Sequence, residues 1–172
     1  VIFTYAPAQF VGKVIEQPKA CTPAPSGLVS WWNMSAFPAQ PGFSVPDQKH
    51  NYNLFWKKFD SGPISIVPGK VGQAVQFDGV NDVLSRAYTP AFDFGAKSFT
   101  IEGWIKMEDL DTFQYLLDYY SVNKGYIISL NSVGGDLCIY SGGFTTSCSG
   151  ANIIVANEWT HFAIARSGQQ VN

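Results

Sequence analysis

The chain has 172 residues, enough for one domain with a sizeable core, and 14% of them are charged, with a net charge of −2. This charge speaks against a nucleic-acid partner, which would need a basic stripe, and no apolar run reaches the roughly eighteen residues of a membrane span. Aromatic residues make up 15%, beside 16 Gly and 10 Pro, which is typical of short strands joined by tight turns.

Residues 1–26 are predicted to be an N-terminal arm and a Pro-rich linker that precede the domain proper. Two strand-like pieces, Val1–Tyr5 and Phe10–Ile15, come before the Pro-rich segment Cys21–Pro25. An apolar arm of this kind is an added edge strand, a floppy terminus, or a strand that pairs with a neighbouring subunit, because strand edges accept other chains.

The domain itself is predicted to cover residues 27–172, with Gly27–Trp32 as its first strand. Residues 33–63 form an atypical insertion rich in proline and aromatic residues. So long an irregular stretch indicates a functional segment or an assembly surface. It begins with Asn33-Met34-Ser35, an N-glycosylation acceptor pattern that has meaning in a eukaryotic secretory setting.

From residue 64 onward the sequence predicts one strand after another. Residues 98–106 alternate cleanly between apolar and polar side chains, and no segment keeps a helical period for ten residues. The sequence therefore predicts an antiparallel two-sheet sandwich. The expected strands are Ile64–Val67, Ala74–Phe77, Val83–Tyr88, Ser98–Lys106, Tyr115–Tyr120, Tyr126–Leu130, Leu137–Tyr140, Ile153–Val155 and Trp159–Arg166.

Four motifs resemble those of laminin G-like domains, in the concanavalin A-like lectin/glucanase superfamily. They are GLVSWW (27–32), PGKVGQAVQFDGVND (68–82), FTIEGWIK (99–106) and EWTHFAIARSGQQVN (158–172). The resemblance implies an all-β, two-sheet antiparallel jelly roll. In relatives the last motif runs into further strands, so we expect the jelly roll to be incomplete at its C-terminal end. Closing strands are then expected after residue 172, in a longer protein or from another chain.

The three cysteines leave at least one without a partner in this chain. Cys138 and Cys148 flank a turn-like centre, and a hairpin folded about Gly143 would bring them opposite each other. A cross-strand disulfide is then geometrically reasonable. The alternative is two small buried thiols in a reduced protein. Cys21 is expected to be free or bonded to a neighbour.

Catalysis is not expected, although glycoside hydrolases share this fold. Those enzymes need two carboxyl groups at a fixed spacing on one strand face. Glu102 is isolated on its strand, and the carboxylates of residues 108–111 lie in a predicted loop, so neither matches. His161 is predicted to be a structural histidine.

Ligand and metal sites are expected at loops and exposed rings. Asp78, Asn81 and Asp82 share one turn and could supply oxygen ligands to calcium, which several relatives bind; the alternative is that they only build the turn. Sugar rings stack on exposed aromatic faces. The candidate ligand contacts of this kind are Trp56, Trp104, Tyr119 and Tyr120.

These features predict a non-catalytic recognition or adhesion module, located outside the cell or on a cell or virion surface. Its expected partner is a glycan or a cell-surface protein. The alternative is a structural subunit of an extracellular filament, virion or surface layer. Such a subunit would assemble as a homo-oligomer or polymer through strand edges, using the N-terminal arm and the insertion.

Overall fold

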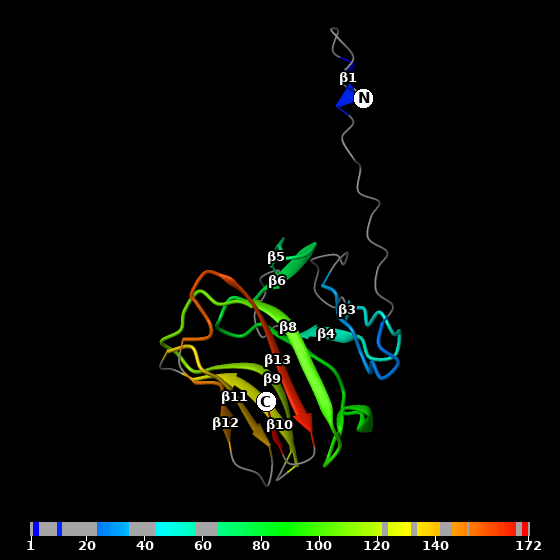
Figure 1. Ribbon diagram of the computed structural model, residues 1–172. Helices are drawn as coiled ribbons and strands as arrows, with labels where there is room; N and C mark the ends of the chain where they lie inside the picture. The colour runs from blue at the N-terminus through cyan, green and yellow to red at the C-terminus, as the bar shows by residue number, and fades with distance from the viewer. Residues whose placement is uncertain are drawn as a thin grey trace.

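The structure is a computed structural model that describes residues 2–3, 10–11, 24–34, 44–57, 65–121, 124–131, 134–141, 146–150, 152–167 and 170–171. It consists of strands and one 3₁₀ turn, η1 (Pro90–Phe92) (Figure 1). No helix in these ranges is long and apolar enough to span a membrane. The strands are β1 (Ile2–Phe3), β2 (Phe10–Val11), β3 (Ser44–Val45), β4 (Leu54–Lys57), β5 (Ser65–Pro68), β6 (Gln73–Gln76), β7 (Val83–Ser85), β8 (Phe99–Lys106), β9 (Gln114–Ser121), β10 (Lys124–Leu130), β11 (Leu137–Ser141), β12 (Ser147–Cys148), β13 (Trp159–Ser167) and β14 (Gln170–Val171).

Two antiparallel sheets form the body of the domain. A four-stranded sheet has the order β12-β11-β10-β9, and a three-stranded sheet has the order β14-β13-β8. Figure 1 shows β8 and β13 in one layer, in front of the layer that holds β9 to β12. Side chains of β8 alternate between half-buried and exposed along its whole length, as expected for a strand with one face on a core. The prediction of an all-β antiparallel sandwich is confirmed.

The main hydrophobic core lies between these two sheets. Tyr126 and Ile128 of β10 and the inward side chains of β11 meet Ile164 of β13 there. Phe94, just before β8, stacks on both Phe99 and Tyr126, with ring centroids 4.8 and 5.5 Å apart. Burial raises the pKa of Tyr126, and the nearby Tyr119 and Asp93 raise it further.

A β-bulge in β9 changes which side chains face the core. Tyr119 pairs with Tyr126 and Leu117 with Ile128, but the next residue of β10, Ser129, pairs with Tyr115. Leu116 is therefore the extra residue, and it packs against the core together with Leu117. In a regular strand, Tyr115 and Tyr120 would face opposite ways, because they are five residues apart. The bulge places both on the outer face.

The insertion of residues 33–63 is partly regular, which corrects the expectation of an irregular stretch. Its described part contributes β3 and β4, and β4 pairs with β7 of the domain. Val45 and Trp56 are the buried centre of a second hydrophobic cluster there, packed against Trp32, Met34, Leu54, Ile66, Val75 and Leu84. The insertion thus packs onto the domain through apolar contacts with strands β5, β6 and β7.

Between β3 and β4, the chain turns around one fully buried carboxylate, Asp47. Its Oδ1 accepts hydrogen bonds from the backbone N–H groups of Trp31 and Lys49, at 2.8 and 3.0 Å. Its Oδ2 accepts from those of Asn51 and Tyr52, at 3.3 and 3.1 Å. One side chain therefore replaces the backbone hydrogen bonds that this irregular loop lacks.

Two predicted strands are wrong. Gly27–Trp32 contains a turn and irregular backbone, and the Trp31 side chain is 52% exposed. Asp47 accepts the Trp31 N–H, which a strand would have used in a ladder. Ile153–Val155 is a bend in which only Ile154 is buried. A short apolar run can thus anchor one side chain in a core without forming a strand.

In the N-terminal arm, β1 and β2 pair antiparallel with each other, Ile2 opposite Val11 and Phe3 opposite Phe10. Among the described strands they pair with no other. Figure 1 shows β1 apart from the sandwich. The arm's pairing with another subunit stays a prediction, and Cys21 lies outside the described residues.

Candidate functional site

The hairpin of β11 and β12 carries the cross-strand disulfide that the cysteine spacing suggested. Cys138 and Cys148 are direct partners in the strand register, and their sulfur atoms are 2.04 Å apart. The prediction of this disulfide is confirmed, and the alternative of two free thiols is wrong for this structure. Because Cys138 alternates with the inward-facing Leu137 and Ile139, the bridge lies on the outer face of the four-stranded sheet.

A hollow of about 340 Å³ lies on this outer face, and we call it the outer groove. Four consecutive strands, β9 to β12, or their flanking loops contribute to it, so its walls come from one continuous stretch of the chain. The lining residues are Phe113, Tyr115, Ile127, Ser129, Asn131, Cys138, Tyr140, Thr146 and Cys148.

Aromatic rings stand at two places along the outer groove. Phe113 and Tyr115 form an edge-to-face pair with centroids 5.0 Å apart, and Tyr115 is 65% exposed. Tyr140 contacts Tyr120 of β9, with centroids 5.6 Å apart. A side-chain hydrogen bond with Tyr120 raises the pKa of Tyr140. Both ring pairs therefore offer partly exposed apolar faces beside hydroxyl groups.

Of the two adjacent tyrosines predicted as ligand contacts, only Tyr120 is on the outer face. Tyr119 points into the sandwich, where Tyr88, Phe92 and Tyr126 surround its ring and its hydroxyl donates to the Thr89 carbonyl oxygen at 2.8 Å. Burial, with a contribution from Tyr88, raises the pKa of Tyr119 to about 12. Tyr119 is therefore a packing residue, because neighbouring side chains on a strand face opposite ways.

Trp56 is also not an exposed platform. Its side chain is 6% exposed and lies at the centre of the second hydrophobic cluster. This placement corrects the expectation of a ligand contact, since a ring enclosed on both faces cannot stack on a sugar. The pairing of β4 with β7 is the reason that it is buried.

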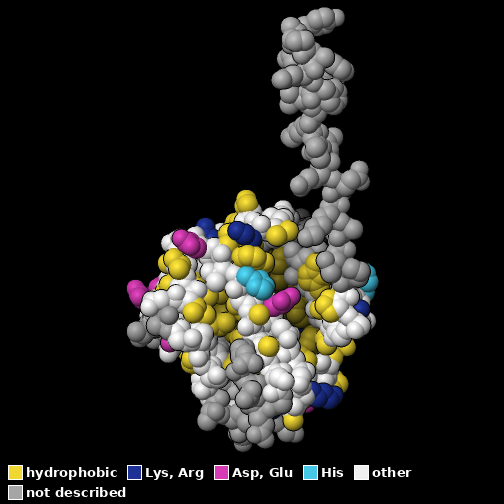
Figure 2. All heavy atoms as spheres, in the orientation of Figure 1, with side chains coloured by type: hydrophobic (Ala, Val, Ile, Leu, Met, Phe, Trp, Pro, Cys, Tyr) yellow, Lys and Arg dark blue, Asp and Glu magenta, His cyan; other side chains and the backbone are white. Residues whose placement is uncertain are grey.

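Trp104 lies on the opposite outer face of the sandwich, where Figure 2 shows basic, acidic and histidine side chains beside hydrophobic ones. It is 45% exposed and lies directly across from His161, with ring centroids 5.1 Å apart. The Lys70 ammonium group is 5.4 Å from the Trp104 ring centre, and His161 Nε2 is 3.8 Å from a Glu102 carboxylate oxygen. His161 was predicted to be structural, but its side chain is 44% exposed.

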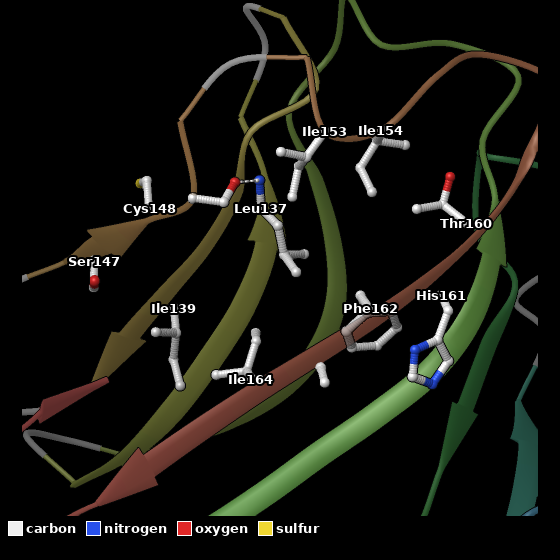
Figure 3. Close-up of a pocket in the computed structure, with 12 residues that line it drawn as sticks. Leu137, Ile139, Ser147, Cys148, Ile153, Ile154, Thr160, His161, Phe162 and Ile164 are labelled. Atoms are coloured by element: carbon white, nitrogen blue, oxygen red, sulfur yellow. Dashed lines mark hydrogen bonds between the residues drawn. The ribbon is translucent and has the colours of Figure 1, made fainter. Parts of the chain in front are cut away.

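A second hollow, of about 360 Å³, lies between the two sheets at the edge of β13 (Figure 3). Leu137 and Ile139 of β11 line one side, and Phe162 and Ile164 of β13 line the other. We call it the inter-sheet cavity. β12 lies between this cavity and the outer groove, because Cys148 lines both hollows.

The turn proposed for calcium is held by its own side chains. Asp78 Oδ1 accepts from the backbone N–H groups of Val80, Asn81 and Asp82, at 2.9 to 3.3 Å, and Asp82 Oδ2 accepts from the Asp78 N–H at 3.0 Å. In the described part of the chain, no group of three or more His, Cys, Asp or Glu side chains could hold a metal ion. These contacts support the turn-building alternative, and calcium binding stays a prediction.

Replacing Asp78 with alanine is expected to lower the free energy of unfolding by about 1–2 kcal/mol, because it removes the acceptor for three backbone donors in an exposed turn. Thermal unfolding measures the loss, with and without calcium. If only the turn contacts matter, the loss is equal in calcium and in a chelator. A loss confined to calcium-containing buffer would instead identify Asp78 as a metal ligand.

The glycosylation pattern is only partly visible. Asn33 is half-buried and precedes Met34, which has a positive φ of 53°. Ser35 lies outside the described residues, so modification at Asn33 stays a prediction.

Sequence reasoning missed three aromatic residues of the outer groove: Phe113, Tyr115 and Tyr140. Tyr140 could have been found, because it alternates with Cys138 in a strand with apolar Leu137 and Ile139 on the other side. Tyr115 could not, since its orientation depends on the bulge at Leu116. Phe113 precedes β9 and has no strand period to place it.

A family model described as the concanavalin A-like lectin/glucanase superfamily matches residues 78–172, which is more than half of the chain. This range contains all of β8 to β14 and therefore both sheets of the sandwich and the outer groove. No curated protein and no solved structure matches the chain significantly.

Proposed function

Because the chain belongs to the concanavalin A-like lectin/glucanase superfamily, we propose that it is a non-catalytic, extracellular recognition module that binds glycans in the outer groove. The observation that carries this proposal is the pair of exposed aromatic platforms, Phe113–Tyr115 and Tyr120–Tyr140, at a hollow on one sheet face. The disulfide between Cys138 and Cys148 supports an extracellular location, because such bonds persist in oxidising compartments.

The chemistry of the outer groove suits a sugar chain. The C–H face of a pyranose ring packs on an aromatic ring, as the Tyr115 and Tyr140 side chains would allow, while sugar hydroxyls exchange hydrogen bonds with polar neighbours. Ser129, Asn131 and Thr146 supply hydroxyl and amide groups on the same face. Since every lining side chain is uncharged, a neutral oligosaccharide is the expected ligand class.

The same lining supports binding rather than hydrolysis. Glycoside hydrolases place two carboxyl groups on either side of the scissile bond. Three side chains line the centre of the outer groove. Ile127 and Ser129 belong to β10, and Asn131 directly follows it. None of these can protonate a leaving group or attack an anomeric carbon.

The test combines an oligosaccharide array with alanine variants of the groove. We expect the wild-type protein to bind neutral oligosaccharides, and Tyr115→Ala and Tyr140→Ala each to weaken binding by about tenfold or more, about 1.4 kcal/mol, because each removes one stacking platform. Isothermal titration calorimetry with the best neutral hit measures the change.

Trp104→Ala is the matched control, because it removes an exposed ring from the opposite outer face. It should leave the affinity unchanged. Absence of any array hit for the folded wild-type protein would contradict the proposal. An affinity loss in Trp104→Ala alone would instead indicate that the glycan binds on the surface around His161 and Glu102.

A structural subunit that assembles through strand edges is the second candidate, and one observation favours it. β13 pairs with β8 along one edge, and along its other edge it pairs with β14 only at Arg166 and Ser167. In the described residues, this second edge therefore has no strand partner from Trp159 to Ala165. Such an edge beside an apolar cavity can accept a strand from another chain. Mass photometry over a concentration series tests this function; strictly monomeric protein at every concentration would contradict it.

A further inference from the structure

We infer that glycan capture in the outer groove is controlled by the redox state of the disulfide: reduction of Cys138–Cys148 releases β12 from the sheet and removes one wall of the groove. This inference rests on the proposed function and adds a regulatory step to the same site. Three observations support it. In the described part of the chain, β12 has few contacts besides the disulfide, Cys148 is the more accessible of the two cysteines, and β12 borders the outer groove.

Among the described residues, few interactions besides the disulfide hold β12 in place. The strand has two residues, and its register with β11 consists of Cys138 opposite Cys148 and Ile139 opposite Ser147. Ser149 adds a backbone hydrogen bond to the Leu137 carbonyl oxygen at 3.0 Å, and its Oγ accepts from the Leu137 N–H at 3.1 Å (Figure 3). All residues from 146 to 150 are exposed, so apolar burial contributes little.

A short edge strand of this kind depends on its covalent link. Without the disulfide, closing the segment between β11 and β12 costs loop entropy that a two-residue ladder offsets poorly. The strands that carry the core, β9, β10 and β11, are held instead by long ladders and by the apolar cluster between the sheets. Reduction should therefore loosen β12 locally and leave the sandwich folded.

The two sulfur atoms differ in access. Cys138 is 5% exposed, whereas Cys148 is on the exposed edge strand. A dithiol reductant supplies the two electrons: its thiolate attacks the Cys148 sulfur, the S–S bond breaks, and the Cys138 thiolate leaves and takes up a proton. The second thiol of the reductant then displaces Cys148 as a thiolate, which is also protonated, and the reductant ends as a disulfide.

Release of β12 changes the outer groove directly. Thr146 and Cys148 line one side of it, next to Cys138 and to the Tyr140 ring on β11. Because β12 also borders the inter-sheet cavity, its departure would join the two hollows and let water reach the Leu137 side of the sheet. A preorganised wall is then lost, and preorganised sites bind more tightly than mobile ones.

The experiment uses the full chain with Cys21→Ser, so that only one cysteine pair can respond. Affinity for the best neutral oligosaccharide of the array is measured by calorimetry before and after reduction with dithiothreitol, and amide hydrogen exchange is followed in the same samples. We expect binding about tenfold weaker after reduction, a change of about 1.4 kcal/mol. Amides of Ser147–Ser149 should exchange faster, those of β10 should stay protected, and reoxidation should restore both.

The variant Cys138→Ala/Cys148→Ser is the control. Its affinity and amide exchange should match those of the reduced protein and should not change when the reductant is added. If it fails to fold, Cys21→Ser protein incubated without dithiothreitol is the control, and unchanged circular dichroism of the reduced sample shows that the sandwich remains folded. Unchanged exchange of Ser147–Ser149 after reduction would overturn the inference, whether or not a glycan binds. Faster exchange with unchanged affinity would overturn the regulatory role, and a folded oxidised protein that binds no oligosaccharide would instead refute the proposed function.

Discussion

Replacing Asp47 with alanine is expected to lower the free energy of unfolding by about 3–5 kcal/mol, a large fraction of the stability of a domain of this size. The carboxylate is fully buried and accepts hydrogen bonds from four backbone N–H groups, those of Trp31, Lys49, Asn51 and Tyr52. The variant leaves these donors without an acceptor inside the protein. Urea unfolding followed by tryptophan fluorescence measures the loss.

The contacts of Asp47 explain why the effect should be large. The donors come from two segments, one before the insertion and one within it, so the side chain ties the loop before β4 to the chain near Trp31. The Asp47 N–H in turn donates to the Asn53 side-chain oxygen at 3.0 Å. Asp111→Asn is the control, because Asp111 is exposed; a change within about 0.5 kcal/mol is expected there. Equal losses in both variants would contradict the assigned role.

Stability should also depend on pH through Asp47. Burial alone raises the pKa of this carboxyl, but hydrogen bonds from the backbone of Trp31, Lys49 and Asn51 and from the Ser30 side chain outweigh it and hold the pKa below its usual value of 3.8. The unfolded chain then binds the proton more readily. The contribution is present above pH 3.8 and is lost as pH falls toward the folded-state pKa. Asp47→Asn should flatten this part of the stability profile.

Replacing Gly125 with alanine is expected to cost about 3 kcal/mol or more. Gly125 is the second residue of β10 and has a φ of +88°, a region that residues with a Cβ rarely adopt. A Cβ at this position would also overlap the Tyr119 carbonyl oxygen. Because that atom belongs to the backbone, the β9–β10 hairpin itself must shift. Thermal unfolding with circular dichroism measures the loss.

Two other glycines separate backbone strain from the steric clash. Gly27→Ala should change stability little, since its backbone is unstrained and nothing lies within 4 Å of the new Cβ. Gly95 has a φ of +52° and equally open space, so Gly95→Ala should cost only the strain, about 1–2 kcal/mol. A Gly125→Ala loss no larger than that of Gly95→Ala would contradict the clash.

Gly125 also matters for the outer groove. It lies directly opposite Tyr120 in the register, so the shift forced on Tyr119 moves Tyr120 and its contact with Tyr140. We therefore expect the Gly125→Ala protein, at a temperature where it is folded, to bind the neutral oligosaccharide more weakly than the Gly95→Ala protein. This comparison separates damage to the groove from general destabilisation.

Much of the sandwich could be predicted from local pattern. The alternation of apolar and polar side chains in Phe99–Lys106 and in the strand around Phe162 reproduces the two faces of β8 and β13. The spacing of Cys138 and Cys148 about a predicted turn at Gly143 was enough to suggest their bridge. These features are local, because they depend on the period of a strand and the length of a hairpin.

Other features depended on contacts between distant segments. The apolar run around Trp31 resembles a strand, yet the buried carboxylate of Asp47, sixteen residues away, takes its backbone hydrogen bond. Trp56 resembles an exposed ring in an irregular insertion, yet the pairing of β4 with β7 encloses it. Neither outcome follows from local secondary-structure propensity, because both depend on which distant segment packs against the residue.

The sequence by itself determined the class of fold, the alternation of most strands and the bridge between β11 and β12, because each follows from residues within one strand or one hairpin. Only the tertiary structure decided which aromatic side chains share a surface. The bulge at Leu116 turns Tyr115 to the same side as Tyr120, and β11 brings Tyr140 beside Tyr120. A shift of one residue in a ladder reverses the face of every side chain beyond it, and that shift is set by packing between sheets.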